Sequence, residues 1–224
     1  MIFMLICTEG EVSEPAFLSA LCSNLKGQAP KNISTKVEII PLPLGGNHGH
    51  RKLIEVANTE VEKYCKNEDN YITLAGKDDR IEKWIVVDYD KMNKRGVDPK
   101  KLREEAKKNG YTLVINNPNF EFFILATLAC PGKTISSVKP NYLTNEINMH
   151  ILSLNKEDTA KGFGKNMLMP LYSKKLHVAD KLFSGMLGYH PELIDKAANL
   201  NVDVSASHYT EMPKLLKQIQ GLYK

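Results

Sequence analysis

Cysteine is scarce in this sequence, and no two cysteines have the spacing of a structural metal site. Only four occur in 224 residues, at Cys7, Cys22, Cys65 and Cys130, and none belongs to a Cys-x-x-Cys pair. The pattern therefore gives no indication of a zinc finger or zinc ribbon. Most of these cysteines fall in apolar or helical patterns, so we expect free thiols in a cytoplasmic protein.

Long apolar runs, strong charge and nucleotide-binding loops are also lacking. The apolar run Ile2 to Cys7 is short and has no basic lead, so we expect no signal peptide, no membrane span and no membrane partner. The formal net charge of +4 permits a polyanionic partner without requiring one. No P-loop motif is present, so any ATP-driven step would need another chain.

The first half of the chain alternates between strand-like and helix-like patterns. The 42% hydrophobic content is enough to bury a sizeable core. Short apolar segments separated by amphipathic ones predict an α/β fold with a mainly parallel sheet of about four strands and helices on both faces. The expected strands are 2–7, 36–40, 84–87 and 111–115.

Helical periodicity dominates the second half. We expect residues 1–130 to form an α/β core and residues 131–224 to form a mostly helical extension packed on it. In the core, Lys91 to Val97 is expected to be a loop, and Asp98-Pro99 is typical of a helix start. Proline at 41 and 43 is expected to end the second strand. The helices expected in the extension are 142–154, 167–186, 191–198 and 213–223.

Three acidic residues follow two of the predicted strands. Glu9 comes after the first strand, and Asp88 and Asp90 come after the third. Ligands of open parallel sheets bind beyond the carboxyl ends of the strands. Residues two apart in an extended chain point to the same side, so the three carboxylates converge if these strands are neighbours. The alternative is that each acid caps a helix or binds a loop amide.

Converging carboxylates favour a bound cation. Without one, like charges repel and raise one another's pKa. Oxygen ligands of this kind suit Mg²⁺ or Mn²⁺, which also hold phosphate oxygens. A site built from Glu9, Asp88 and Asp90 would therefore support hydrolysis or transfer at a phosphate, with a carboxylate as acid or base.

Four further residues are candidates for supporting this site or for contacting substrate. Glu14 is either a further ligand or an acid favoured by the start of a helix. Asn117 belongs to an Asn-Pro turn after the fourth strand, and Glu121 follows in the first turn of the next helix, which places both near the same crevice. The alternative is that Asn117 serves only the turn and that Glu121 is an acid favoured by the helix dipole. Lys91 follows Asp90 directly and is a candidate for contacting substrate.

Histidine and lysine provide weaker candidates. His48 and His50 lie in a glycine-bearing segment, where they either contact phosphate and move protons or are ordinary exposed residues. Lysines recur in the second half, either as a solvated helical surface or as a ridge that contacts phosphate. The lysines concerned are Lys156, Lys161, Lys165, Lys174, Lys175 and Lys181.

Several of these stretches, taken in order, resemble a known family. The segments 6–10, 13–17, 84–90 and 117–121 are similar to motifs of the RloB-like family, a branch of the Toprim (topoisomerase-primase) superfamily, and 207–210 gives a weaker match. The resemblance implies a Toprim core in which Glu9, Asp88 and Asp90 hold a divalent metal. It also makes Asn117 and Glu121 family-motif positions.

The same resemblance implies a function in defence against phage. Related Toprim effectors are nucleases, and some cut tRNA, so a Mg²⁺- or Mn²⁺-dependent nuclease acting on RNA or DNA in abortive infection is expected. The alternative is a non-catalytic sensor of nucleotides or nucleic acid, or the partner of an ATPase. Nucleic acid is the expected partner, and a defence-system protein and a second copy of the chain are further candidates.

Overall fold

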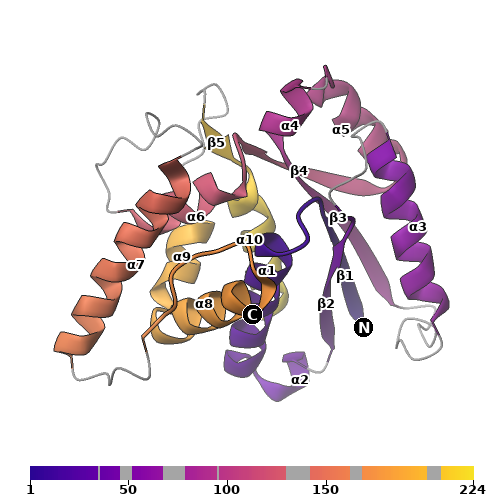
Figure 1. The fold of residues 1–224 in the computed structure, drawn as a ribbon. Helices are drawn as coiled ribbons and strands as arrows, with labels where there is room; N and C mark the ends of the chain where they lie inside the picture. Colours follow the sequence, from indigo (N-terminus) through magenta and orange to yellow (C-terminus); the bar gives the residue numbers. More distant parts are fainter. Residues whose placement is uncertain are drawn as a thin grey trace.

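A mainly parallel sheet, five-stranded in the part of the chain that the structure describes, forms the centre of the protein (Figure 1). The structure is a computed structural model that describes residues 1–34, 36–45, 52–67, 79–94, 96–129, 142–161, 168–200 and 208–224. The strand order is β2-β1-β3-β4-β5; the first four strands are parallel and β5 is antiparallel to β4. This confirms the predicted sheet and adds a fifth strand. The strands are β1 (Ile2–Thr8), β2 (Val37–Pro43), β3 (Arg80–Asp88), β4 (Tyr111–Asn117) and β5 (Tyr209–Thr210).

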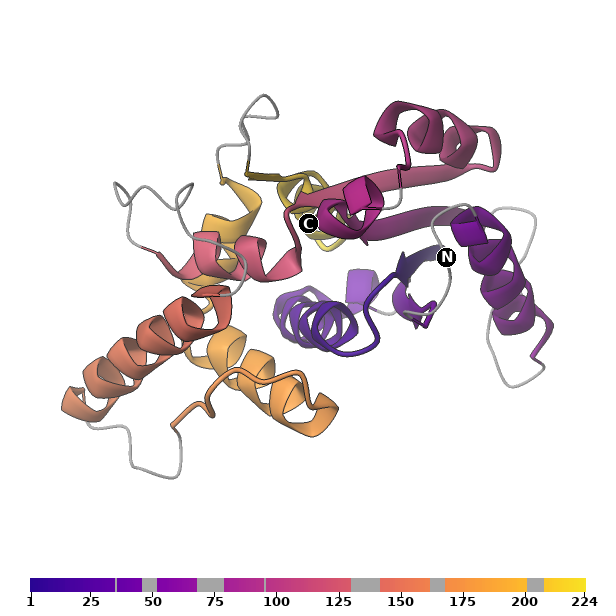
Figure 2. The ribbon, with the colours of Figure 1, turned by 45° about the horizontal axis from the view of Figure 1, so that its top comes forward.

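Helices cover both faces of the sheet, as predicted (Figures 1 and 2). One face packs against α3 (Leu53–Lys66) and α5 (Pro99–Lys108). The opposite face packs against α1 (Ser13–Gln28), α6 (Phe120–Leu128) and α10 (Met212–Leu222), and more helices pack outside these. The remaining helices are α2 (Lys31–Ser34), α4 (Tyr89–Lys94), α7 (Leu143–Ala160), α8 (Leu176–Tyr189) and α9 (Glu192–Ala198).

One of the two hydrophobic cores joins the predicted α/β core to the predicted extension. Its centre is Phe17 of α1, whose ring meets Phe123 of α6 at 5.3 Å and Phe183 of α8 at 5.5 Å between centroids, both edge to face. Edge-to-face aromatic pairs add stability beyond the area that they bury. Residues from both halves of the chain therefore stabilise one continuous core.

Strands β3 and β4 are longer than predicted, and two further boundaries in the first half differ for reasons of local structure. Strand β2 continues through Pro41 to Pro43, because it is the edge strand and a missing N–H is tolerated there. The loop predicted at Lys91 to Val97 is also wrong in its first part, because α4 begins at Tyr89, directly after β3, and runs to Lys94. The start of α5 was correctly predicted: Asp98 accepts a hydrogen bond from the backbone N–H of Lys100 at 2.9 Å.

The largest error concerns the predicted helix at 167–186. Helix α8 begins only at Leu176, and residues 168–175 form neither helix nor strand. Pro170 disfavours a helix here because it lacks an N–H and restricts the residue before it. We call residues 168–175 the linker segment, and it reaches the candidate site described below.

The remaining sequence expectations concern cysteine and the membrane. Cys7, Cys22 and Cys65 are free thiols, as expected. Cys130, His48 and His50 lie outside the described residues. Within the described ranges, no helix has the length and apolar character needed to cross a membrane.

Candidate functional site

Glu9 and Asp88 meet at the carboxyl ends of two neighbouring parallel strands. Strand β1 lies beside β3, as the sequence argument required, and the Glu9 N–H donates to the Val86 carbonyl at 3.0 Å. The Glu9 side chain reaches the end of β3, where its Oε2 accepts a hydrogen bond from the Asp88 N–H at 3.2 Å. Glu9 is 3% exposed and Asp88 8%. Two buried acids thus share one strand-end site.

Asp88 also connects this site to the start of α6. Its Oδ1 accepts a hydrogen bond from the N–H of Phe120, the first residue of that helix, at 2.9 Å. Backbone N–H groups at a helix start favour a negative charge. A second hydrogen bond connects the start of α4 to the chain between β4 and α6: the Asp90 N–H donates to the Pro118 carbonyl at 2.9 Å. Both ties hold the ends of β3 and β4 together.

Asp90 does not extend the strand as the sequence argument assumed. Strand β3 ends at Asp88, and Asp90 lies in the first turn of α4, so the premise that the two acids share an extended segment is wrong. One Asp90 carboxylate oxygen is buried. The role of Asp90 as a ligand stays a prediction, and the side chain of Lys91 lies outside what the structure describes.

Glu14 is buried in the first turn of α1, beside the loop that carries Glu9. It is 5% exposed. Its carboxylate occupies the space where Gly10 would carry a Cβ, so any side chain at position 10 would collide with it. Gly10 therefore allows the Glu14 carboxylate to approach the backbone of the β1–α1 loop.

Glu121 is the centre of a hydrogen-bonded network next to these acids. Its Oε1 accepts from the Tyr172 hydroxyl at 2.9 Å and from Lys174 Nζ at 2.7 Å. The Tyr172 hydroxyl also lies 2.8 Å from Ser13 Oγ. Glu121, Tyr172 and Ser13 are buried, so the network links α6, the linker segment and α1 away from solvent.

The charges in this network favour the ionised forms of both partners. Burial opposes ionisation of Glu121, but the hydrogen bond and charge of Lys174 and the bond from Tyr172 lower the pKa of this carboxyl overall. Burial likewise opposes charge on Lys174, yet the bond and charge of Glu121, with the charges of Asp88 and Glu14, raise the pKa of this lysine. The charge of Lys174 thus interacts with three of the four buried acids of this site, which are Glu9, Glu14, Asp88 and Glu121.

Two asparagines at the end of β4 have different surroundings. Asn116 pairs in register with Asp88 of β3 and Thr210 of β5, is fully buried, and accepts a hydrogen bond from the Thr210 hydroxyl at 2.7 Å. Asn117, the residue selected from the sequence, pairs with Tyr209 and is half-buried. The structure therefore places Asn116, rather than only Asn117, beside the strand-end acids.

Two asparagines of α7 hold the linker segment in place. Asn155 donates to the Met169 carbonyl at 2.8 Å and accepts from the Met169 N–H at 2.9 Å. Asn148 makes the same pair of bonds with the backbone of Tyr172, at 3.4 and 2.6 Å. The two asparagines are seven residues apart, about two helical turns, so they lie on one face of α7. This clamp fixes the segment that carries Tyr172 and Lys174.

Replacing Asn155 with alanine should destabilise the protein by about 2–3 kcal/mol, because the N–H and C=O of Met169 would lose their partners in a buried place. Chemical denaturation of the wild type and the variant measures this difference. Asn199→Ala is the matched control, since Asn199 is exposed and its side chain donates to the Asp195 carbonyl of its own helix end. An Asn155 variant as stable as this control would show that the clamp contributes nothing.

Two carboxylates of the strand-end site are able to bind a divalent metal. Among the described residues, no group of three or more His, Cys, Asp or Glu side chains is placed to hold a metal ion. Mg²⁺, however, is commonly bound by one or two carboxylates and keeps several waters. Glu9 and Asp88, two buried carboxylates on adjoining strand ends, fit that requirement.

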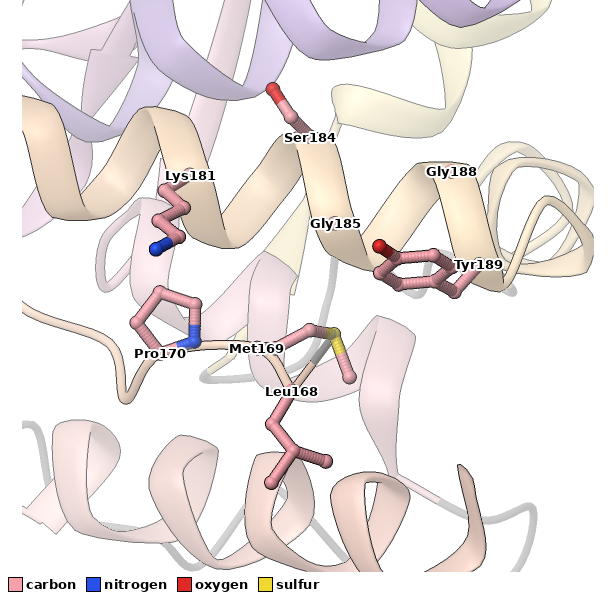
Figure 3. A pocket seen from close by; sticks show the side chains of 8 residues that line it. All are labelled: Leu168, Met169, Pro170, Lys181, Ser184, Gly185, Gly188 and Tyr189. Atoms are coloured by element: carbon pink, nitrogen blue, oxygen red, sulfur yellow. The ribbon is translucent and has the colours of Figure 1, made fainter. Parts of the chain in front are cut away.

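A pocket of about 420 Å³ lies between the start of the linker segment and α8 (Figure 3). Met169 and Pro170 face Tyr189 and Lys181 across it, and Gly185 forms part of its wall. None of the four buried acids lines this pocket. It is therefore separate from the strand-end site, although both use the same segment of chain.

The fold and the site together define an α/β protein with buried carboxylates at the ends of neighbouring parallel strands. A family model described as RloB-like protein matches residues 4–219. The chain therefore belongs to the RloB-like family, as the motifs indicated. A search of curated proteins and a search of solved structures each found no significant match.

Sequence reasoning missed several residues around the site. Tyr172 carries no local signal, because it lies in a segment predicted to be helical. Lys174 appeared only as one of many lysines, and Ser13 only within a family motif. Pro170 was the available signal: a proline inside an apolar helical pattern indicates a break in the helix.

Proposed function

We propose that this protein is a nuclease of the Toprim type that depends on Mg²⁺ or Mn²⁺. It hydrolyses phosphodiester bonds in RNA, with tRNA as one candidate, or in DNA, and it acts in phage defence by abortive infection. The observation that carries the proposal is the meeting of Glu9 and Asp88 at the ends of β1 and β3. Membership of the RloB-like family supports the same conclusion.

Glu9 and Asp88 would hold the metal. A bound divalent cation neutralises charge on the phosphate and lowers the pKa of a bound water. The bond from the Asp88 N–H orients Glu9, and the bond from the Phe120 N–H orients Asp88. These backbone contacts leave the two carboxylates preorganised, which is how a site avoids reorganisation during the reaction.

The acids nearby have supporting roles in this proposal. Glu14 is packed against Gly10 and adds negative charge next to Glu9. Glu121 orients Lys174 and Tyr172. Asn116 fills the space beside Asp88 and is held by Thr210 of β5. The site therefore draws on β1, β3, β4 and the linker segment.

A cleavage panel tests the proposed activity. Purified protein is incubated with tRNA, single-stranded DNA and plasmid, with Mg²⁺, with Mn²⁺, or with EDTA. We expect cleavage of at least one substrate that requires the metal and is lost in EDTA. Binding to nucleic acid without cleavage under any metal would contradict the nuclease proposal and favour a non-catalytic sensor or a partner of an ATPase.

A further inference from the structure

Lys174 is the exposed member of an otherwise buried polar network. Its side chain is 70% exposed, whereas the Glu121 side chain that it contacts at 2.7 Å is 8% exposed. The ammonium group thus bridges the buried acids and the solvent. A lysine with this placement can keep its contact with Glu121 and still meet a ligand from outside.

The position of Lys174 is fixed by the fold. The linker segment is clamped to α7 through both backbone polar groups of Tyr172, two residues before Lys174. The Tyr172 side chain anchors the same point to Ser13 and Glu121. A surface lysine on a free loop has no such support, so the ordering of Lys174 costs little when a ligand binds.

The negative charge around the site favours a cation at its rim. Glu9, Glu14, Asp88 and Glu121 are all buried at the same end of the sheet. A nucleic acid that approaches these carboxylates brings more negative charge and is repelled. Lys174, which feels the charges of Glu121, Asp88 and Glu14, offers a positive charge where a phosphate would arrive.

We propose that Lys174 is a substrate-binding residue that contacts a backbone phosphate of the nucleic acid at the rim of the acid site. This inference rests on the proposed nuclease function, because it names the residue that receives the substrate of that site. It assigns a role to one lysine among the many in the second half of the chain. The linker segment then completes the site from the helical part of the protein.

The test is the salt dependence of binding, measured without cleavage. A fluorescein-labelled single-stranded oligonucleotide is titrated in EDTA at several salt concentrations. Loss of one phosphate contact in Lys174→Ala should reduce the slope of log K against log salt by about 0.7, which corresponds to about a five-fold weaker affinity at 0.1 M salt. Lys174→Arg keeps the charge and should retain the wild-type slope.

Lys26→Ala is the matched control. Lys26 also forms a 2.8 Å ion pair with a glutamate, Glu38, but it lies thirteen residues along α1 from Ser13, about 20 Å away. The slope of log K against log salt in Lys26→Ala should equal that of the wild type. The inference would be overturned if Lys174→Ala kept the wild-type slope, or if the slope fell equally in Lys26→Ala. It would also be overturned if the wild type did not bind the oligonucleotide.

The two proposals fail in distinguishable ways. Cleavage that needs metal, together with an unchanged slope in Lys174→Ala, would reject the role of Lys174 and leave the nuclease proposal standing. A slope that falls only in Lys174→Ala, together with no cleavage under any metal, would support the phosphate contact and reject the nuclease. Binding and cleavage are therefore measured on the same preparations.

Discussion

Replacing Glu9 with glutamine or Asp88 with asparagine should lower the rate of metal-dependent cleavage by more than about 100-fold. Changing an outer partner of a metal ligand typically costs 10–100-fold in affinity or activity, and loss of a ligand itself should cost more. Initial rates on the substrate identified by the cleavage panel, at saturating Mg²⁺, measure the effect. The two variants should lose activity to a similar extent, since each removes one of two carboxylates.

These two substitutions remove a carboxylate while keeping the hydrogen bonds of the fold, so a loss of activity would not reflect unfolding. The amide oxygen of glutamine can still accept the hydrogen bond from the Asp88 N–H, and that of asparagine can still accept the bond from the Phe120 N–H. The matched control is Glu11→Gln, because Glu11 is an exposed acid on the same loop. Full activity in folded Glu9→Gln and Asp88→Asn proteins would contradict the proposal that these two residues hold the metal.

Asp90 is tested in the same series. The sequence predicted it as a third ligand, but the structure places it in the first turn of α4. A loss in Asp90→Asn as large as the loss in Asp88→Asn would support a site with three carboxylates. A small loss would leave Glu9 and Asp88 as the pair that holds the metal.

Replacing His190 with alanine should destabilise the protein by about 3–5 kcal/mol. His190, at the end of α8, is 6% exposed, and its Nε2 lies 3.0 Å from Oδ2 of Asp158 on α7, which is 4% exposed. Removing the imidazole leaves a buried carboxylate without its histidine partner. For a chain of this length, the loss corresponds to a fall in Tm of about 6–20 °C.

Glu192→Ala provides the control for this prediction. Glu192 lies 3.2 Å from the other ring nitrogen of His190, but its side chain is 69% exposed. An exposed contact of this kind contributes about 0–1 kcal/mol, so the control should unfold close to the wild-type temperature. Equal losses of stability in the two variants would show that the buried contact between His190 and Asp158 contributes no more than the exposed contact with Glu192. The contact matters for the site because α7 clamps the linker segment that leads into α8.

The sheet could be predicted because its signals are local. Short apolar runs mark the parallel strands, and capping residues such as Asp98 mark helix starts. The strand order was not encoded locally, yet the assumption that β1 lies beside β3 was confirmed. Strand β5 was missed because it is only two residues long and depends on pairing with β4.

The part of the site on β1 and β3 could be predicted from strand ends alone. The part on the linker segment could not, because it depends on contacts between distant residues: Ser13 and Tyr172 are 159 positions apart. The apolar pattern at 167–186 indicated helix, whereas Pro170 and the bonds from Asn155 and Asn148 hold residues 168–175 in another conformation. Tertiary contacts thus overrode the local pattern where the chain reaches the site.

The central claim is that Glu9 and Asp88 hold a divalent cation, and Mn²⁺ titration tests it most directly. Thermal unfolding and calorimetry of the wild type, Glu9→Gln and Asp88→Asn are compared at millimolar Mn²⁺. A metal that binds only the folded state raises Tm. At a free Mn²⁺ concentration of 100 times Kd, binding adds about 2.7 kcal/mol to the free energy of unfolding. We predict binding and a raised Tm in the wild type and loss of both in the two variants. Equal Mn²⁺ affinity in all three proteins, or no shift in any of them, would contradict the account.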